Sequence, residues 1–351
     1  MKYLDLIRDL TNANGISGFE DEVVEVVKAY SKSTSLEVDS MQNIYLPKKQ
    51  NTGNRPVVMV DGHSDEVGFM VQFIKSNGLI KFIPIGGWQD ANVAAQKVRI
   101  RNKWGKYVKG IVASTPPHFL SPAQRDAAVK IDNMVIDVGA TSREEVVNDF
   151  GIEIAAPIVP DVDFYINDNK IMCGKAFDNR IGTAAVIATL EDLANEDLDI
   201  DVVGTISTQE EVGLRGAEVT VKKVNPDLAI VYEGTPADDT FTSSFETQAA
   251  LKKGPQLRHR DGSMIINPKF IAYARLVAQK NNIPFQDAVR AGGGTNGGKI
   301  HLVSGAVPTI VIGVPVRYAH THYGYCSYDD FVNSVELGKA ILRDLNKDLN
   351  Y

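Results

Sequence analysis

The sequence predicts an α/β fold, in which a mainly parallel sheet with flanking helices is interrupted by an inserted, smaller all-β domain. Over most of the chain, apolar strand-like segments alternate with amphipathic helical segments, which is typical of a parallel sheet. Between residues 67 and 160, strand-like segments instead follow one another and are joined by short turns. A chain of 351 residues also exceeds what one hydrophobic core usually supports. We therefore expect residues 1–66 and 161–351 to form one α/β domain around a β domain at 67–160.

The composition is that of an ordinary soluble protein, with 44% hydrophobic and 23% charged residues. The net charge of -7 and the pI near 5.5 disfavour a nucleic-acid backbone or an anionic membrane as a partner. The two cysteines, Cys173 and Cys326, provide neither a disulfide framework nor a thiolate zinc cluster. Because no run of roughly eighteen apolar residues occurs, we expect a cytoplasmic protein without a membrane span or a signal peptide.

The chain before residue 67 predicts two helices followed by two strands. Apolar side chains at residues 3–10 recur on one helical face. Ser17 and Glu20 have the spacing of a capping box, which predicts the start of the second helix there. The strands are predicted at 44–46 and at 57–60, and the second of them runs into the polar sequence HSDE at 63–66.

Consecutive hairpin signals predict the inserted β domain. Asn77 and Gly78 form a typical hairpin turn, and a second turn lies at residues 102–105. No convincing helical pattern is found before Ser142, which has capping-box spacing with Glu145. The strand-like segments are GFMVQFI (68–74), LIKFIPI (79–85), KVRIR (97–101) and YVKGIVA (107–113).

After residue 170 the alternation of strand and helix returns. Helices are predicted after Asp178, at 214–224, from Pro268 onward and around Phe331. Strands are predicted at KIMC (170–173), VVGTIS (202–207), LAIVY (228–232, stopping at Glu233) and VPTIVIGVPV (307–316), with a loop at 234–253 and a glycine-rich turn at 292–296.

The stretch VVGTISTQEEVGLRGA at 202–217 concentrates charge where a buried strand ends. Glu210 and Glu211 are adjacent there, and neighbouring carboxylates repel and are costly to remove from water. A cation should therefore lie against them, with one Glu holding a metal and the other handling a proton. The alternative interpretation is a solvated turn.

Polar side chains with metal-ligating chemistry follow the other predicted strands too. In an open, mainly parallel sheet, the carboxyl ends of the strands share one rim, where ligand sites form. Imidazole and carboxylate without thiolate suit zinc, cobalt or manganese. Because the carboxylates outnumber what one tetrahedral ion needs, we expect two ions with a bridging carboxylate. The residues at these strand ends are His63 with Asp65, Asp178, Glu210 with Glu211, Glu233, and His320.

Each of these residues also has a structural interpretation on its own. His63 could be a hydrogen-bonded buried histidine, and Asp178 could be an N-cap. Glu233 could face solvent, and His320 could be a loop histidine. The metal hypothesis is favoured because all of them are expected at the same place in the fold. The other histidines lack an acidic partner at a comparable strand end and are left out of the ligand set: His118, His259, His301 and His322.

Four motifs in order resemble those of the tetrahedral aminopeptidases, a family that includes glutamyl aminopeptidases and members once labelled endoglucanases. They are HSDEVG (63–68), DNR (178–180), QEEVGLRGA (209–217) and RYAH (317–320), and SGFE (17–20), GGW (86–88) and PPH (116–118) extend the similarity over nearly the whole chain. The resemblance implies a zinc-peptidase-like catalytic domain, a dinuclear zinc or cobalt site, and a hollow tetrahedron of twelve subunits built from dimers. The inserted β domain would then serve dimerisation, assembly and pocket shaping.

Matching motif positions implies a role for each site residue. His63 and Glu233 would bind one ion and Glu211 and His320 the other, with Asp178 as the bridge. Glu210 would be the general base. Asp65 would be the partner of His63, which agrees with chemistry, because a carboxylate two residues after a ligand histidine can fix its tautomer.

The implied reaction is removal of the first residue from short peptides. A hydroxide bridging the metals would attack the scissile carbonyl, and Glu210 would take its proton and return it to the leaving amine. The sequence departs from the family pattern at Glu233, where many relatives have Asp, and at Asn296, where relatives usually have Asp. Gly292 stands where several glutamyl-specific relatives carry Lys, a loss for which Arg258 or Arg290 could compensate.

Three other functions remain open on the sequence. A dinuclear deacylase or carboxypeptidase would use a similar sheet and similar ligands. A glycosidase could use paired carboxylates but does not need the two histidines. A non-catalytic relative could keep the metal site as a scaffold or binding protein.

Overall fold

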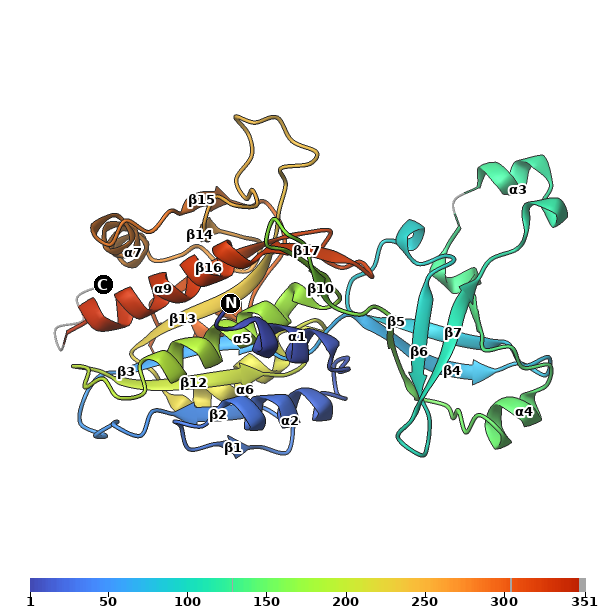
Figure 1. Cartoon of the computed structure of the whole chain (residues 1–351), viewed down its shortest axis with the longest axis horizontal. Coiled ribbons are helices and arrows are strands. Elements are labelled where there is room, and N and C mark those ends of the chain that lie inside the picture. Colours follow the sequence, from blue (N-terminus) through green and yellow to red (C-terminus); the bar gives the residue numbers. More distant parts are fainter. Residues whose placement is uncertain (128, 304, 347–351) are drawn as a thin grey trace.

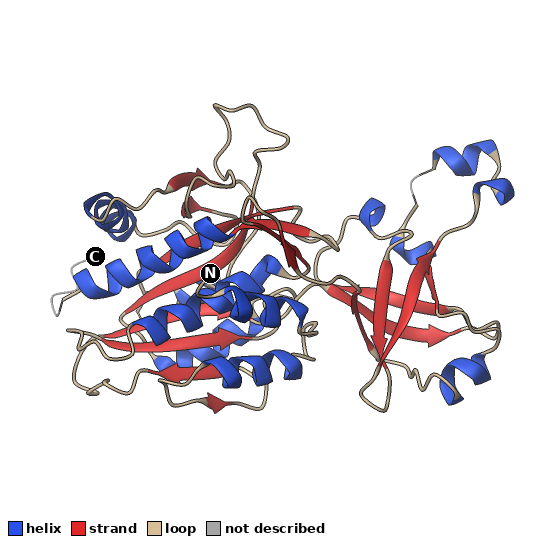
Figure 2. Cartoon of the chain, in the orientation of Figure 1, coloured by secondary structure: helices blue, strands red, loops and turns tan. Residues whose placement is uncertain are grey.

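The computed structural model describes residues 1–127, 129–303 and 305–346 and has two bodies, a helix-flanked sheet and a β-barrel beside it (Figure 1). Colouring by secondary structure separates them clearly, because strands dominate the barrel and helices cover the sheet (Figure 2). The predicted α/β class with a smaller all-β part is therefore confirmed.

Four neighbouring parallel strands form the middle of the sheet, in the order β12, β3, β13, β16. Their apolar β-branched residues are buried on both faces, as expected of a parallel sheet covered by helices. Ser207 of β12 pairs with His63 of β3, so these two strands end together. The bounds are β3 Val57–His63, β12 Asp201–Ser207, β13 Leu228–Pro236 and β16 Thr309–Arg317.

Antiparallel strands extend this core on both sides. On the β12 side, β2 (Ile44–Pro47) and β1 (Glu37–Val38) follow. On the β16 side, the order continues through β17 (Gly324–Ser327), β11 (Ile171–Gly174) and β10 (Tyr165–Ile166). A branch pairs β14 (Gln256–Arg260) with β16 and β15 (Gln286–Val289) with β14.

Helix α5 (Phe177–Asp192) is the main packing element against the sheet, and it contacts β3 and β13 directly. Small residues permit this close approach: a Cβ on Gly182 would lie 2.6 Å from the carbonyl oxygen of Tyr232. Because α5 begins beside the ends of these strands, its first turn lies at the rim of the sheet. The other helices of this body are α1 Leu4–Asn12, α2 Asp21–Tyr30, α6 Arg215–Val224, α7 Pro268–Lys280, α8 Gly297–Ile300 and α9 Tyr328–Asp344.

The second body is a closed barrel with strand order β4-β5-β8-β7-β6-β9. Closure leaves no open sheet edge, and the inward side chains form a core of their own around Phe69 and Phe82. Its strands are β4 Gly68–Ile74, β5 Ile80–Ile85, β6 Lys97–Arg101, β7 Tyr107–Ala113, β8 Val135–Asp137 and β9 Pro157–Pro160. Short helices join them: η1 Asp90–Asn92, η2 Pro117–Phe119, α3 Pro122–Asp126, η3 Ile131–Asn133 and α4 Arg143–Asn148.

Three sequence predictions about these elements are wrong. Ser17 does not cap a helix, because α2 begins at Asp21 and no side-chain cap bond is made at its N-cap. The inserted segment does contain an α-helix before Ser142, namely α3, which Ser121 and Gln124 begin with a capping box. Strand β13 continues past Glu233 to Pro236, because its pairing with β16 continues over those residues.

The start of α4 is confirmed, with the Ser142 side chain accepting the backbone N–H of Glu145. The chain enters the barrel directly after Glu66 and returns to the sheet through β10 and β11. The domain limits 1–66, 67–160 and 161–351 stay a prediction. Within the described ranges, the model contains no helix with the length and apolar character needed to span a bilayer.

Candidate active site

The predicted site residues come together at the carboxyl rim of the four parallel strands. His63 is the last residue of β3, Glu210 and Glu211 follow β12, and Glu233 lies on β13. His320 lies in the turn after β16, and Asp178 lies in the first turn of α5. These residues therefore lie together at the carboxyl ends of the parallel strands, as the sequence predicts.

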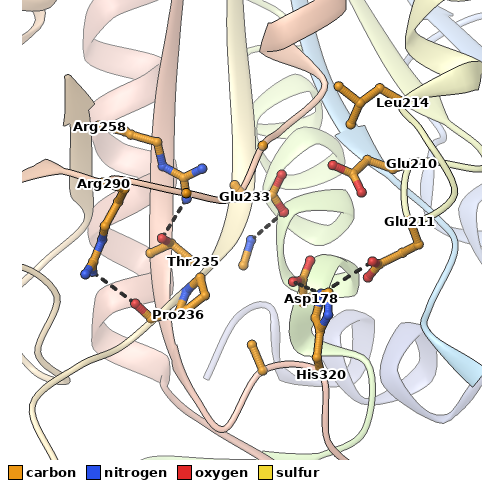
Figure 3. A pocket seen from close by; sticks show the side chains of 15 residues that line it. Asp178, Glu210, Glu211, Leu214, Glu233, Thr235, Pro236, Arg258, Arg290 and His320 are labelled. Carbon is orange, nitrogen blue, oxygen red and sulfur yellow. Dashed lines mark hydrogen bonds and ion pairs between the residues drawn. The ribbon is translucent and has the colours of Figure 1, made fainter. Parts of the chain in front are cut away.

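The carboxylate of Asp178 lies between the two histidines. Its contact with His320 is seen in Figure 3. Its Oδ1 is 3.2 Å from Nε2 of His63, and its Oδ2 is 3.3 Å from Nε2 of His320. Glu233 Oε1 is 3.5 Å from the same atom of His63, whereas Glu211 Oε2 is 3.3 Å from that of His320. The cluster thus has two halves that share one carboxylate.

Glu210 stands slightly apart, with Oε2 at 3.9 Å from Nε2 of His63. Potential ligand atoms of His63, Glu210 and Glu233 all lie within 4.8 Å of one another, as do those of His63, Asp178 and Glu211. Proximity alone therefore permits Glu210 as a ligand. Its distance to a histidine nitrogen is the longest of these carboxylate–histidine distances, so we do not count Glu210 among the candidate ligands.

The electrostatics of the cluster demand positive charge. Burial raises the pKa of Glu233 to about 7. Burial also raises the pKa of Glu210 well above its usual value, and the negative charges of Glu233 and Glu211 raise it further. Burial disfavours the charged ring of His320, but Asp178 and Glu211 outweigh it and raise its pKa to about 11. Glu210 and Glu233 likewise raise the pKa of His63 far above its ordinary range. The site attracts protons strongly, and divalent cations would supply the same charge.

Unsatisfied oxygens in the cluster fit that requirement. Glu211 Oε1 and Glu233 Oε2 are buried and make no hydrogen bond within the described residues. An orphaned buried carboxylate oxygen is costly unless a cation or donor meets it. Imidazole nitrogens and carboxylate oxygens are the donor set of zinc, cobalt and manganese sites. The residues present therefore fit a pair of divalent ions.

Asp65 is a buried carboxylate that contacts several parts of the site. Its Oδ1 is 3.3 Å from Nδ1 of His63 and also accepts the backbone N–H of Glu210 at 3.0 Å. Its Oδ2 accepts the N–H of Glu211 and the hydroxyl of Ser17. This single carboxylate thus holds a histidine and the loop that follows β12.

Glu20 is a residue of the site's surroundings that sequence analysis missed. Its side chain is fully buried, and Oε1 accepts the N–H of Gly18 and, at 3.3 Å, that of Gln209. Burial and the charge of Asp65 raise its pKa to about 8. Together with Asp65 it receives three successive N–H groups of residues 209–211. The SGFE stretch is the sequence signal for this residue, although the Ser17–Glu20 spacing equally predicts a helix cap.

Buried charged residues around the start of α5 also stabilise the segments around the site. Arg180 and Lys175 are fully buried and both donate to Oε1 of Glu66, Lys175 at 2.6 Å. Arg180 also donates to backbone oxygens of Ala13 and Ser64. The Arg of the DNR motif therefore joins α5, the end of β3 and the loop after α1.

Asn296, where the sequence departs from the family pattern, has a buried hydrogen-bond partner. Its Nδ2 donates at 2.7 Å to Oδ2 of Asp61, a fully buried carboxylate whose Oδ1 accepts the hydroxyls of Thr205 and Ser207. An Asp at 296 would face that carboxylate directly. Asn296 therefore supplies a donor that Asp61 requires.

A cavity of about 530 Å³ opens beside the carboxylates. Arg258 and Arg290 line it opposite Glu210 and Glu211 (Figure 3). Each guanidinium already has a carboxylate partner, Asp261 at 3.1 Å for Arg258 and Asp238 at 2.7 Å for Arg290. The cavity is thus anionic at the metal-ligating end and lined by paired cations at the other.

The sequence profile of the M42 glutamyl aminopeptidase family matches residues 43–337. A glutamyl aminopeptidase from Lactococcus lactis is 33% identical over 349 residues, which cover 99% of this chain and 97% of the relative.

Solved structures give the same result. A TET aminopeptidase from a marine sediment Thaumarchaeota archaeon has a TM-score of 0.94 and 36% identity, over 98% of this chain and 97% of that one. A TET1 peptidase from Pyrococcus horikoshii, which can assemble into a tetrahedron or a large octahedral shell, has a TM-score of 0.87 and 26% identity, over 98% of this chain and 100% of that one.

Proposed function

The chain belongs to the M42 glutamyl aminopeptidase family and is an aminopeptidase, and from that premise we propose that it removes the first residue of short peptides with two divalent metal ions. The observation that carries the proposal is the shared carboxylate of Asp178, with one oxygen facing each histidine at 3.2 and 3.3 Å. A carboxylate placed in this way suits a bridge between two ions.

We assign His63 and Glu233 to one ion and His320 and Glu211 to the other, with Asp178 shared. Zinc or cobalt suits these ligands best, and manganese is also compatible. When bound, such ions would lower the pKa of a shared water and polarise the scissile carbonyl.

Glu210 is assigned as the general base. Its carboxylate reaches into the cavity but stays 3.9 Å from the nearest histidine nitrogen, so it is available to exchange a proton with the attacking water. A raised pKa suits a group that first takes this proton and then gives it to the leaving amine. Asp65 holds the backbone of Glu210 and thereby fixes the base relative to His63.

The free amino end of the substrate would lie among the carboxylates, because an ammonium group is attracted to their negative charge. This contact would confine cleavage to the first residue. The side chain of that residue would then extend into the cavity toward Arg258 and Arg290. Their carboxylate partners reduce the net positive charge of that wall, so acidic preference does not follow from the two arginines alone.

We further propose a homo-oligomer, up to a tetrahedral dodecamer built from dimers, in the cytoplasm. The support is the likeness to TET peptidases, one of which assembles into a tetrahedron. The barrel at residues 67–160 would serve dimerisation and assembly and shape the pocket.

Elemental analysis of the purified protein, combined with a panel of aminoacyl and peptide substrates before and after metal removal, tests the function. We expect two ions per subunit, activity only on free amino ends, and loss of activity on chelation that added zinc or cobalt reverses. Cleavage of peptides with blocked amino ends would favour a deacylase or carboxypeptidase. Chelator-resistant hydrolysis of glycosides would favour a glycosidase, and bound metal without any turnover a binding protein.

A further inference from the structure

His320 is held from two sides by different parts of the fold. Its Nε2 faces Asp178 and Glu211, whereas its Nδ1 lies 2.9 Å from the carbonyl oxygen of Gly87. Gly87 belongs to the segment GGW (residues 86–88), which follows barrel strand β5 and is here called the GGW loop. Because a carbonyl can only accept, Nδ1 must carry the hydrogen, which leaves the lone pair of Nε2 for a cation.

The two histidines therefore differ in what orients them. His63 is almost fully buried, and its Nδ1 faces the backbone oxygen and the carboxylate of Asp65, two residues further along the same chain segment. His320 has a half-exposed side chain and depends on a backbone group of the other body of the molecule. The orientation of His320 thus depends on the barrel, whereas that of His63 does not.

The close approach at Gly87 requires the absence of a side chain. A Cβ there would lie 3.3 Å from Nδ1 of His320, a tight contact that the imidazole could relieve only by moving. The preceding Gly86 has φ of +77°, and a Cβ there would lie 2.6 Å from a side-chain carbon of Val67. Both glycines let the GGW loop run against the rim of the sheet.

Trp88 makes a second contact with the turn that carries His320. Its indole stacks on Phe69 of the barrel at 4.6 Å between centroids and lies 5.2 Å from the ring of His322. Its Nε1 donates to the carbonyl oxygen of Gly68 at 3.1 Å. His322 is buried, and neither of its ring nitrogens has a hydrogen-bond partner in the described part of the chain, so it packs here as an aromatic ring.

We propose that the GGW loop is a positioning element for His320, through which the inserted barrel sets the affinity for one of the two divalent cations. The Gly87 carbonyl orients the imidazole, and Trp88 fixes the loop against both Phe69 and His322. The inference rests on the proposed function only in needing a metal site. It adds that the two cations differ in what their affinity depends on. One affinity would be set by residues of the α/β body alone, and the other would also depend on a contact with the barrel.

Trp88→Ala tests this, with Trp104→Ala as the matched control. The chain has two tryptophans. Both are in the barrel, but Trp104 lies in the turn between β6 and β7, where its ring packs over Gly151. Titration of each metal-free variant with Co²⁺, followed by visible absorption and by bound metal per subunit, gives the affinity of each cation separately.

We expect Trp88→Ala to weaken the binding of one cation roughly 10- to 100-fold and to leave the binding of the other unchanged. This is the usual effect when a ligand histidine loses its orienting partner, here the Gly87 carbonyl that Trp88 keeps in position. Trp104→Ala should bind both cations as the wild type does. Trp88→Phe keeps an aromatic ring between Phe69 and His322 and should recover most of the lost affinity. Gly87→Ala should weaken the same cation and shift its absorption bands.

Equal affinities in Trp88→Ala and wild type would overturn the inference, as would an equal loss of both cations or the same loss in Trp104→Ala. Circular dichroism of each variant shows whether the fold is kept, and Trp88→Phe remains informative if the Ala variant does not fold. Failure of the wild type to bind cations would instead refute the proposed function itself.

Discussion

The backbone N–H of Glu210 donates to Oδ1 of Asp65 at 3.0 Å, and the same oxygen lies 3.3 Å from Nδ1 of His63. One buried carboxylate therefore fixes the distance between the proposed base and a proposed ligand. We expect Asp65→Ala to lower kcat/KM and the affinity for metal about 10- to 100-fold each. Metal titration and steady-state kinetics of the same preparation measure both effects.

Ser17→Ala is the control for Asp65, because it removes one hydroxyl donor to Oδ2 and leaves the carboxylate in place. Its effect on both quantities should be several-fold smaller. Similar losses in the two variants would mean that the carboxylate of Asp65 has no particular role.

Glu210→Gln should retain both cations and lower kcat by about 10²- to 10⁴-fold, because an amide cannot take a proton from the attacking water. KM should change little. Glu211→Gln is the contrasting variant, since it alters a proposed ligand and should lose bound metal as well as turnover. Full activity of Glu210→Gln would remove this residue as the base.

Glu233→Ala should reduce bound metal toward one ion per subunit, because Glu233 Oε1 is the second carboxylate oxygen beside His63. Glu233→Asp should keep both ions, since it retains the carboxylate oxygens that a divalent cation needs. Metal content by elemental analysis distinguishes the two variants. Unchanged stoichiometry in Glu233→Ala would exclude it as a ligand.

Glu20 should make stability depend on pH. Burial raises its pKa to about 8 in the folded protein, above the ordinary value of 4.5. The folded state therefore binds more protons than the unfolded state between these values, so the contribution of Glu20 to stability falls as pH rises from about 4.5 to about 8. Glu20→Gln stays neutral, and its stability relative to wild type should rise with pH by up to about 1.4 kcal/mol per unit.

Urea denaturation of the metal-loaded proteins between about pH 5 and pH 9 measures this difference. Glu25→Gln, on the exposed face of α2, is the control and should follow the wild-type pH dependence. A constant difference between Glu20→Gln and wild type across that range would contradict the expectation.

Asn296→Asp should destabilise the protein by roughly 3 kcal/mol, because it replaces the amide donor to Asp61 with a second buried carboxylate. The combination with Asp61→Asn should restore part of the stability, since one amide and one carboxylate again face each other. Denaturation curves of the single and double variants test this. Additive losses would show that the two residues do not interact.

The sequence predicted the convergence of the candidate ligands because parallel strands end at a common rim, and each candidate followed an apolar segment that is easy to recognise. His63 and Glu211 illustrate this, since β3 and β12 are neighbours and end together. The β insertion was predictable for a related reason, as hairpin turns carry their own residue signature.

The contacts that orient the site were not predictable. Glu20 meets Gln209, which is 189 residues away in the sequence, and its spacing from Ser17 is equally that of a capping box. The partner of His320 is a backbone carbonyl, which every residue possesses, so the GGW stretch does not by itself indicate this contact. The burial of His322 follows from the placement of the barrel, which no local pattern specifies.

The insertion of the barrel between β3 and the rest of the sheet also orders events during translation. All barrel strands are synthesised together, between residues 68 and 160, and pair only with one another, so they can form while the nascent chain is still growing. Strand β3 can pair only after β12 and β13 have been synthesised. Four of the five proposed ligands also follow the last barrel strand in the sequence. If the site binds ions as proposed, its ligand set would therefore be complete only after His320 has been synthesised, long after the last barrel strand.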